Sequence, residues 1–332
     1  MSANKSDTDN LPWIEKYRPE RLDDVYGQSD IVETVRKFAE GGKLPHLLFY
    51  GPPGTGKTST ISALAREIYG KDYRNMVLEL NASDDRGIEV VRNQIKEFAS
   101  TRQIFSKGYK LIILDEADAM TSAAQNALRR IIEKFTKNTR FCILANYIHK
   151  LTPAIISRCT RFRFQPLPQH AIELRINNVM AKERLQLSES AKEALLRLSN
   201  GDMRKALNVM QAAKATLDNP EKDTIGEDVI YECIGAVRPK DLESILVTIL
   251  HDDWSTAYES VKKIRMSNGL ALVDMIQGLV ECLESYKLKD ITWATMLSNL
   301  SDIEYAISKG GNDKIQCTAT ISAIKSSMEL EL

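Results

Sequence analysis

Residues 51–58, with the sequence GPPGTGKT, have the glycine content and spacing of a loop that binds phosphate groups. An apolar run at 46–50 precedes the loop and a helix-forming stretch at 58–70 follows it, as such a loop requires. Glycines let the backbone turn sharply and direct its N–H groups at phosphate oxygens, and the helix N-terminus adds partial positive charge. The predicted phosphate site comprises Gly51, Pro52, Pro53, Gly54, Thr55, Gly56, Lys57, Thr58 and Ser59.

Two side chains of this loop and two later acidic residues predict the chemistry. Lys57 is expected to reach the β- and γ-phosphates, and Thr58 is expected to ligate Mg²⁺. The apolar run LIIL (111–114) ends in Asp115, which can hold Mg²⁺ through water, and Glu116, which can polarise an attacking water. The carboxyl ends of strands are where α/β sheets place ligands. The sequence therefore predicts ATP hydrolysis with Mg²⁺, with Lys57 and Glu116 as catalytic residues.

The elements that must position these residues follow from the hydrophobic pattern. Apolar runs alternate with amphipathic stretches in the first half of the chain, which predicts a parallel sheet with helices on both faces. These runs are residues 46–51, 75–80, 110–115, 140–146 and 161–167. After QPLP the chain reads as helical, and a second break falls at GAVRP. We expect an α/β core at 1–165, a small helical domain at 166–236 and a C-terminal helical domain at 237–332.

Composition limits the class of protein. The chain has 332 residues, of which 43% are hydrophobic and 27% charged, as expected for a soluble protein of two or three domains. No apolar run reaches the roughly 18 residues of a membrane span, and the polar start, MSANKSDTDN, lacks a secretory signal. The five cysteines have no metal-type spacing, which favours a reducing compartment. The net charge is zero, but residues 129–163 contain nine Lys or Arg and one acid, so binding to phosphate backbones remains open.

Six motifs occur in the order found in the small subunits of replication factor C, above all those of fungi, and the resemblance covers essentially the whole chain. They are WIEKYRP (13–19), the phosphate loop, LNASDDRG (80–87), DEAD (115–118), ISRC (156–159) and GDMR (201–204). The resemblance implies an AAA+ ATPase core, a helical lid and a helical collar that assembles subunits. It also implies a nuclear clamp loader with one large and three further small subunits, which opens the PCNA sliding clamp by ATP and loads it at primer–template DNA. Alternative large subunits are implied as well.

The family resemblance also assigns roles near the nucleotide. Ile14, Arg18 and Tyr26 resemble the adenine and ribose pocket, since an aliphatic and an aromatic side chain with one cation suit a base and its sugar. Asn146 ends the fourth apolar run and resembles the polar residue that orients the attacking water. Arg204 resembles the lid arginine that reaches the γ-phosphate.

Further roles concern neighbouring molecules. Arg158 resembles an arginine finger that acts in trans, inserted into the ATP site of the adjacent subunit, a task that suits a guanidinium fork. Asn81 resembles a switch residue that holds the catalytic glutamate away from water until DNA binds. DNA contact is expected from the helix that starts near residue 85, through Arg86, Arg92 and Lys96, and would be to the sequence-independent phosphate backbone. A solvated charged face is the alternative for this helix.

Three other functions share the phosphate loop. A small-molecule kinase needs an acceptor pocket and an inserted lid, which Arg158, Arg204 and the long helical remainder fit poorly. A scaffold that binds nucleotide structurally does not need Glu116. Another AAA+ assembly, such as a checkpoint clamp loader, stays open because small subunits of this kind are shared among loaders. The DEAD tetrad also occurs in helicases, but the residues after Pro166 offer no second set of strands.

Overall fold

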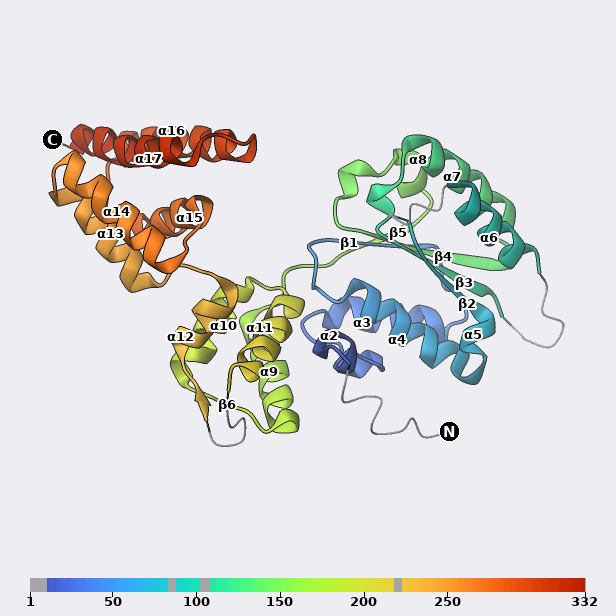
Figure 1. Cartoon of the computed structure of the whole chain (residues 1–332). Helices are drawn as coiled ribbons and strands as arrows, with labels where there is room; N and C mark the ends of the chain where they lie inside the picture. Colours follow the sequence, from blue (N-terminus) through green and yellow to red (C-terminus); the bar gives the residue numbers. More distant parts are fainter. Residues whose placement is uncertain (1–10, 83–87, 102–107, 218–222, 332) are drawn as a thin grey trace. The chain divides into compact units, whose positions relative to one another are not determined.

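The computed structural model describes residues 11–82, 88–101, 108–217 and 223–331 and is drawn in Figure 1. The chain forms two compact units, Met1–Thr224 and Ile225–Leu332, and the boundary falls inside the two-residue strand β7 (Thr224–Ile225). Among the described residues, no helix combines the length and apolar character needed to cross a membrane. The division expected at residues 165 and 236 stays a prediction.

A five-stranded parallel sheet lies at the centre of the first unit, and its strand order is β2-β3-β4-β1-β5. The strands are β1 (Leu47–Tyr50), β2 (Val77–Asn81), β3 (Lys110–Asp115), β4 (Thr139–Ala145) and β5 (Thr160–Arg163). Because the strands are parallel, the loops that follow β1, β3 and β4 leave the sheet at the same edge. This edge therefore brings together the phosphate loop, the acidic pair and Asn146, as the sequence predicts.

Helices cover both faces of this sheet (Figure 1). Alternate residues of a strand point to opposite faces, so Leu111 and Ile113 pack with α3 (Ser29–Glu40) and α4 (Lys57–Tyr69). Ile112 and Leu114 pack on the other face, against α6 (Ile88–Ser100) and α7 (Ser122–Phe135). Burial on both faces explains why these strands are continuous apolar runs. The predicted α/β core is confirmed.

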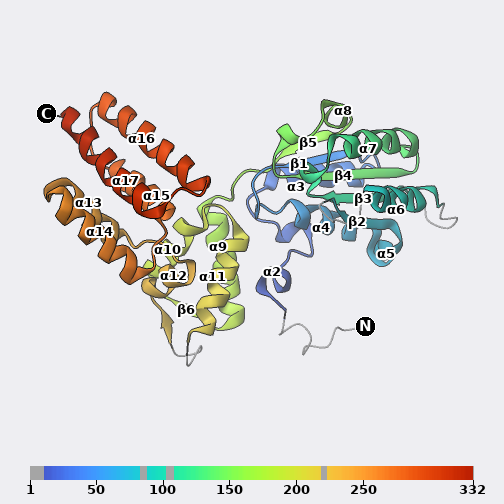
Figure 2. The same ribbon diagram turned by 45° about the horizontal axis from the view of Figure 1, so that its top comes forward.

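Short helices complete the first part of this unit. They are α2 (Trp13–Lys16), α5 (Tyr73–Met76), α8 (Pro153–Ile156) and the 3₁₀ helices η1 (Leu22–Asp24), η2 (Gly70–Asp72), η3 (Ala117–Ala119) and η4 (Ile148–Lys150). The rest of the unit is helical, as Figure 2 shows, and contains α9 (Gln169–Glu183), β6 (Gln186–Leu187), α10 (Glu189–Ser199) and α11 (Met203–Ala215). Ser188 and Asp202 cap the N-termini of α10 and α11 by accepting hydrogen bonds from backbone N–H groups.

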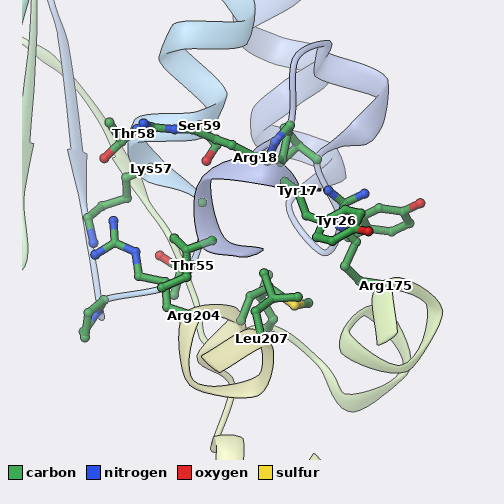
Figure 3. Close-up of a pocket in the computed structure, with 18 of the residues that line it drawn as sticks. Tyr17, Arg18, Tyr26, Thr55, Lys57, Thr58, Ser59, Arg175, Arg204 and Leu207 are labelled. Atoms are coloured by element: carbon green, nitrogen blue, oxygen red, sulfur yellow. Dashed lines mark hydrogen bonds between the residues drawn. The ribbon is translucent and has the colours of Figure 1, made fainter. Parts of the chain in front are cut away.

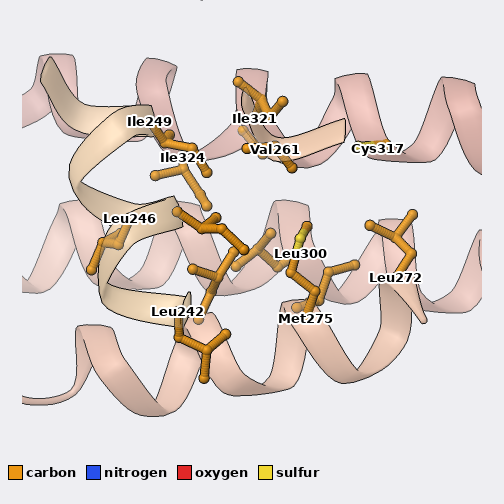
Figure 4. Packing of buried hydrophobic residues seen from close by; sticks show 14 of the residues in the cluster. Leu242, Leu246, Ile249, Val261, Leu272, Met275, Leu300, Cys317, Ile321 and Ile324 are labelled. Carbon is orange, nitrogen blue, oxygen red and sulfur yellow. The ribbon is translucent and has the colours of Figure 1, made fainter. Parts of the chain in front are cut away.

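The second unit is built from helices, in agreement with the sequence. They are α12 (Glu227–Ile234), α13 (Pro239–His251), α14 (Trp254–Asn268), α15 (Leu272–Leu283), α16 (Asp290–Ser308), α17 (Asp313–Met328) and η5 (Glu329–Glu331). Buried side chains from α13 to α17 form one hydrophobic cluster, part of which is drawn in Figure 4. Gly278 of α15 allows close approach to α13, because a Cβ atom there would lie 2.7 Å from Leu242 Cδ1.

Candidate functional site

A cavity of about 380 Å³ lies at the carboxyl edge of the sheet and extends to the helices that follow it in the first unit. Figure 3 shows residues that line it. Its walls are formed by the phosphate loop, the ends of β3 and β4, residues between 14 and 26, and the start of α11, together with Leu167 and Arg175. The residues of the phosphate loop in the lining are Pro53, Gly54, Thr55, Gly56, Lys57, Thr58 and Ser59. The predicted nucleotide residues therefore meet at one cavity.

Gly54 places the phosphate loop directly against the helical part of the unit. Its φ of +69° is in the left-handed region, and a Cβ atom there would lie 1.6 Å from Asp202 Oδ1. The backbone N–H of Met203 also donates a hydrogen bond to the Gly54 carbonyl oxygen, at 3.4 Å. A side chain at position 54 would thus separate the loop from α11.

Lys57 is held by three acceptors. Its Nζ donates hydrogen bonds to the carbonyl oxygens of Gly51 (2.7 Å) and Pro52 (2.8 Å), and to Asn146 Oδ1 (2.9 Å). Gly51 and Pro52 lie behind the cavity lining and fix the lysine. Burial lowers the pKa of the Lys57 amine to about 8, Asp115 opposes this shift, and the Arg204 charge adds to it. Anionic phosphates beside Lys57 would raise its pKa again.

Asp115 is the centre of a second network at the end of β3. Its Oδ2 accepts a hydrogen bond from Thr58 Oγ1 at 2.8 Å, and its Oδ1 accepts one from the Glu116 backbone N–H at 2.9 Å. Glu116 has a φ of 54°, in the left-handed region, and its exposed side chain lines the cavity. A hydroxyl and a carboxylate oxygen side by side are ligands that Mg²⁺ prefers, with phosphates and water completing its shell. The donor set therefore fits Mg²⁺.

Another part of the cavity lining combines apolar, aromatic and charged side chains. Ile14, Arg18 and Tyr26 line the cavity, as the sequence resemblance implies. Arg18 also pairs with Glu15 at 3.2 Å. The guanidinium of Arg175 lies over the Tyr26 ring, with 5.7 Å between its Cζ atom and the ring centroid. This end of the cavity suits a planar base and its sugar.

Arg204 lies at the phosphate end. It is at the start of α11, and Figure 3 shows its guanidinium directed towards Lys57. Two cations on one side of a cavity, with oriented backbone N–H groups, form a site for several negative charges. The arrangement suits the phosphate groups of a nucleotide.

Sequence reasoning missed nine lining residues. They are Glu15, Tyr17, Pro19, Asp24, Val25, Leu167, Arg175, Met203 and Leu207. A signal existed for some of them, because Met203 and Leu207 are four positions apart on α11 and share the face beside Arg204. No local signal existed for Arg175, whose place depends on packing of α9.

Besides Gly51 and Pro52, the predicted residues Asn81 and Arg158 lie outside the cavity lining. Asn81 ends β2 and is paired in register with Asp115, one residue before Glu116. Arg158 follows α8, where one guanidinium nitrogen lies 2.5 Å from Glu133 Oε1 and the other donates to the Ala154 carbonyl oxygen at 2.5 Å. Neither residue is among those that line the cavity of its own chain.

The expected DNA contacts are described only in part. Arg86 lies outside the described residues. Arg92 belongs to α6, but its side chain is not among those described, and Lys96 is exposed on the same helix. The hypothesis of DNA contact thus stays a prediction.

Two family models match the chain. Residues 47–167 match the ATPase family associated with various cellular activities (AAA), and residues 237–323 match the replication factor C C-terminal domain. Replication factor C subunit 3 of Saccharomyces cerevisiae is 69% identical over 331 residues, which cover 99% of this chain and 97% of that protein. Replication factor C subunit 5 of Homo sapiens is 47% identical over 322 residues, covering 97% of this chain and 93% of that protein.

A comparison with solved structures supports the fold. The Holliday junction branch migration motor RuvB of Thermotoga maritima superposes with a TM-score of 0.53 and 16% sequence identity. The match covers 82% of this chain and 93% of that chain. At this identity the likeness concerns the fold alone.

Proposed function

The chain belongs to the replication factor C family, and from this premise we propose that its cavity binds ATP with Mg²⁺ and drives the loading of a sliding clamp on DNA. The chain is an ATPase subunit of the clamp loader of DNA replication, and it works in a complex with other replication factor C subunits. The observation that carries the proposal is the meeting of Lys57, Asp115, Glu116 and Arg204 at one cavity.

The arrangement supports a division of labour among these residues. Lys57 and Arg204 neutralise the phosphate charges, and Thr58 with Asp115 would hold Mg²⁺, which supplies further neutralisation when bound. Glu116 accepts a proton from, or polarises, the attacking water. Asn146, whose Oδ1 accepts a hydrogen bond from the Lys57 amine, would orient that water. The base and ribose fit beside Ile14 and Tyr26.

The finer partners follow from the family. We propose that the complex has one large and three further small subunits, acts in the nucleus, opens PCNA and binds primer–template DNA through its backbone. Binding of ATP assembles the clamp-opening state, and hydrolysis triggered by DNA releases the clamp. Arg158 acts in trans in the next subunit, and Asn81 restrains Glu116 before DNA binds.

The test is Glu116→Gln in the reconstituted complex, with the phosphate-loop lysine replaced in every other subunit. The variant keeps the shape of the side chain but removes the base. We expect ATP affinity to stay within about twofold and hydrolysis with PCNA and primed DNA to fall by about a hundredfold or more. The control is Glu40→Gln, at an exposed residue that ends α3. Normal turnover by Glu116→Gln would contradict the proposed role.

A further inference from the structure

A buried cluster of charges joins the N-terminal segment, defined here as residues 13–18, to helices α9 and α11. The Glu183 carboxylate at the end of α9 lies 2.7 Å from Lys16 Nζ and 2.7 Å from Lys214 Nζ. It also accepts a hydrogen bond of 2.5 Å from the Tyr17 hydroxyl. Only 8% of the Glu183 side chain is exposed. One carboxylate therefore connects Lys16 and Tyr17, which are adjacent in the sequence, to the distant Lys214 of α11.

Other contacts fix the same segment to the same helices. The backbone N–H of Trp13 donates a hydrogen bond of 2.9 Å to Gln211 Oε1 on α11. The buried Arg175 guanidinium on α9 donates a hydrogen bond to the Tyr17 carbonyl oxygen. Lys214 Nζ lies 5.5 Å from the centroid of the Trp13 ring. Both ends of α2 are thus bound to the helical part of the unit.

A few residues later, from Leu22 onward, the chain contacts the α/β part instead of α9 and α11. The backbone N–H of Leu22 donates a hydrogen bond of 3.0 Å to Glu67 on α4, and the Leu22 side chain is buried in the core on that face of the sheet. Asp23 pairs with Arg36 on α3 at 2.6 Å. The backbone that leads to Tyr26 is therefore attached to the α/β part, while the Tyr26 ring contacts Arg175 of α9. Ile14, Tyr17 and Arg18, which line the same cavity, belong to the segment held by α9 and α11.

We propose that Glu183 is a positioning residue for nucleotide binding: it fixes the N-terminal segment to α9 and α11, so that the base end of the cavity forms as part of the helical lid. The inference rests on the proposed function, because it assigns the base of the nucleotide to the wall that carries Ile14. Glu183 itself does not line the cavity and acts through Lys16, Tyr17 and Lys214.

The charge state of Glu183 agrees with this role. Burial by itself would raise the pKa of the carboxyl group, but hydrogen bonds from Lys16, Lys214 and Tyr17 lower it, in net, to about 2. The group is therefore ionised at neutral pH. Removal of this buried charge leaves Lys16 and Lys214, whose side chains are partly exposed, without their counter-ion, which costs more than the loss of a fully exposed pair. Glu183→Gln keeps the size of the side chain and removes only that charge.

The experiment measures the affinity of the assembled complex for two ligands, with the phosphate-loop lysine replaced in all other subunits. The ligands are Mg²⁺-ATP and inorganic tripolyphosphate, which lacks the base and ribose, and calorimetry gives the affinity for each. If the segment occupies its place about a tenth of the time in Glu183→Gln, the apparent Kd for ATP rises about tenfold. Tripolyphosphate affinity stays within about twofold, because the phosphate end is untouched.

Two further variants separate positioning from general stability. Glu189→Gln removes an exposed carboxylate on α10 that pairs with Lys192 at 3.1 Å, and it should change neither affinity. Lys214→Gln should weaken ATP binding as Glu183→Gln does, and the double variant should be no weaker than Glu183→Gln, since both act through one cluster. Lys214→Gln also serves if Glu183→Gln fails to fold.

The outcomes are distinct. Selective loss of ATP affinity in Glu183→Gln or Lys214→Gln supports the inference. An equal loss for both ligands, or no loss for ATP, overturns it and leaves the proposed function intact. Failure of the unmodified site to bind ATP would overturn the proposed function and the inference together.

Discussion

The phosphate end and the base end of the cavity are held together in different ways. At the phosphate end, Lys57 and Thr58 are fixed by hydrogen bonds to their own loop and to the ends of two strands. At the base end, the N-terminal segment is fixed by contacts with residues much later in the chain, such as Lys16 with Glu183, 167 positions away. Binding of the phosphates and binding of the base should therefore be weakened by different substitutions.

The largest effect is expected from a residue that belongs to neither end. Arg158→Ala should leave ATP affinity of this chain nearly unchanged, because the side chain contacts Glu133 and Ala154 rather than the cavity. Hydrolysis in the adjacent subunit should fall by about a thousandfold or more, as for other arginine fingers. The measurement uses mixed complexes in which one subunit at a time keeps its phosphate-loop lysine.

The matched control for that comparison is Arg161→Ala, at an exposed arginine of β5. It should leave hydrolysis in both sites unchanged. Loss of turnover confined to this chain's own site in Arg158→Ala would mean that the arginine acts in cis.

Lys57→Ala tests the phosphate end of the cavity. It removes a cation expected to meet the phosphates directly, so affinities for ATP and tripolyphosphate should both fall, by about tenfold to a hundredfold. Replacing Lys71, an exposed lysine of η2, should change neither. Near-normal ATP affinity in Lys57→Ala would disprove the assignment of the phosphate site.

The pH dependence of binding gives a smaller effect at the same end. Burial lowers the pKa of Lys57 to about 8 in the free protein, and bound phosphates should raise it. Binding then favours the protonated lysine, so affinity is constant below pH 8 and falls by about tenfold per pH unit as the pH rises above 8. Titrations from pH 7 to 9.5 should show this slope in the natural chain and none in Lys57→Ala. A flat profile in both would contradict it.

The smallest effect is expected for the binding of DNA. Replacing Arg86, Arg92 and Lys96 by alanine should weaken binding to all DNA sequences alike. It should also reduce the slope of log affinity against log salt by about two to three, roughly one unit per phosphate contact. The affinities can be measured by fluorescence anisotropy. An unchanged slope would mean that these residues form a solvated charged face and do not contact DNA.

Much of the fold could be predicted because parallel strands buried on both faces leave a plain signal. The five apolar runs correspond to the five strands, but their ends differ. Asn75 and Met76, expected in a strand, belong to α5, and the last strand ends at Arg163 rather than at 167. Pro166 keeps the strand from continuing to 167, since proline lacks the N–H that a strand pairing requires, although the Phe164 N–H still donates a hydrogen bond to the Tyr50 carbonyl oxygen.

The two ends of the cavity also differ in how well the sequence predicts them. The phosphate end is encoded by contiguous residues, so GPPGTGKT and the acidic pair predict it. The base end depends on which distant helix receives the N-terminal segment. Arg175 and Glu183 are ordinary charged residues of an amphipathic helix until α9 packs against Tyr17. No local pattern distinguishes them from solvated side chains.

A structure of the complex with Mg²⁺ and a non-hydrolysable ATP analogue tests the central claim most directly. We expect the triphosphate to bind between Lys57 and Arg204, the metal ion beside Thr58 and Asp115, and the base against Ile14 and Tyr26. We further expect Lys16 and Tyr17 to keep their contacts with Glu183. A triphosphate bound away from Lys57, or a base that leaves the wall of Ile14 and Tyr26 uncovered, would contradict the account.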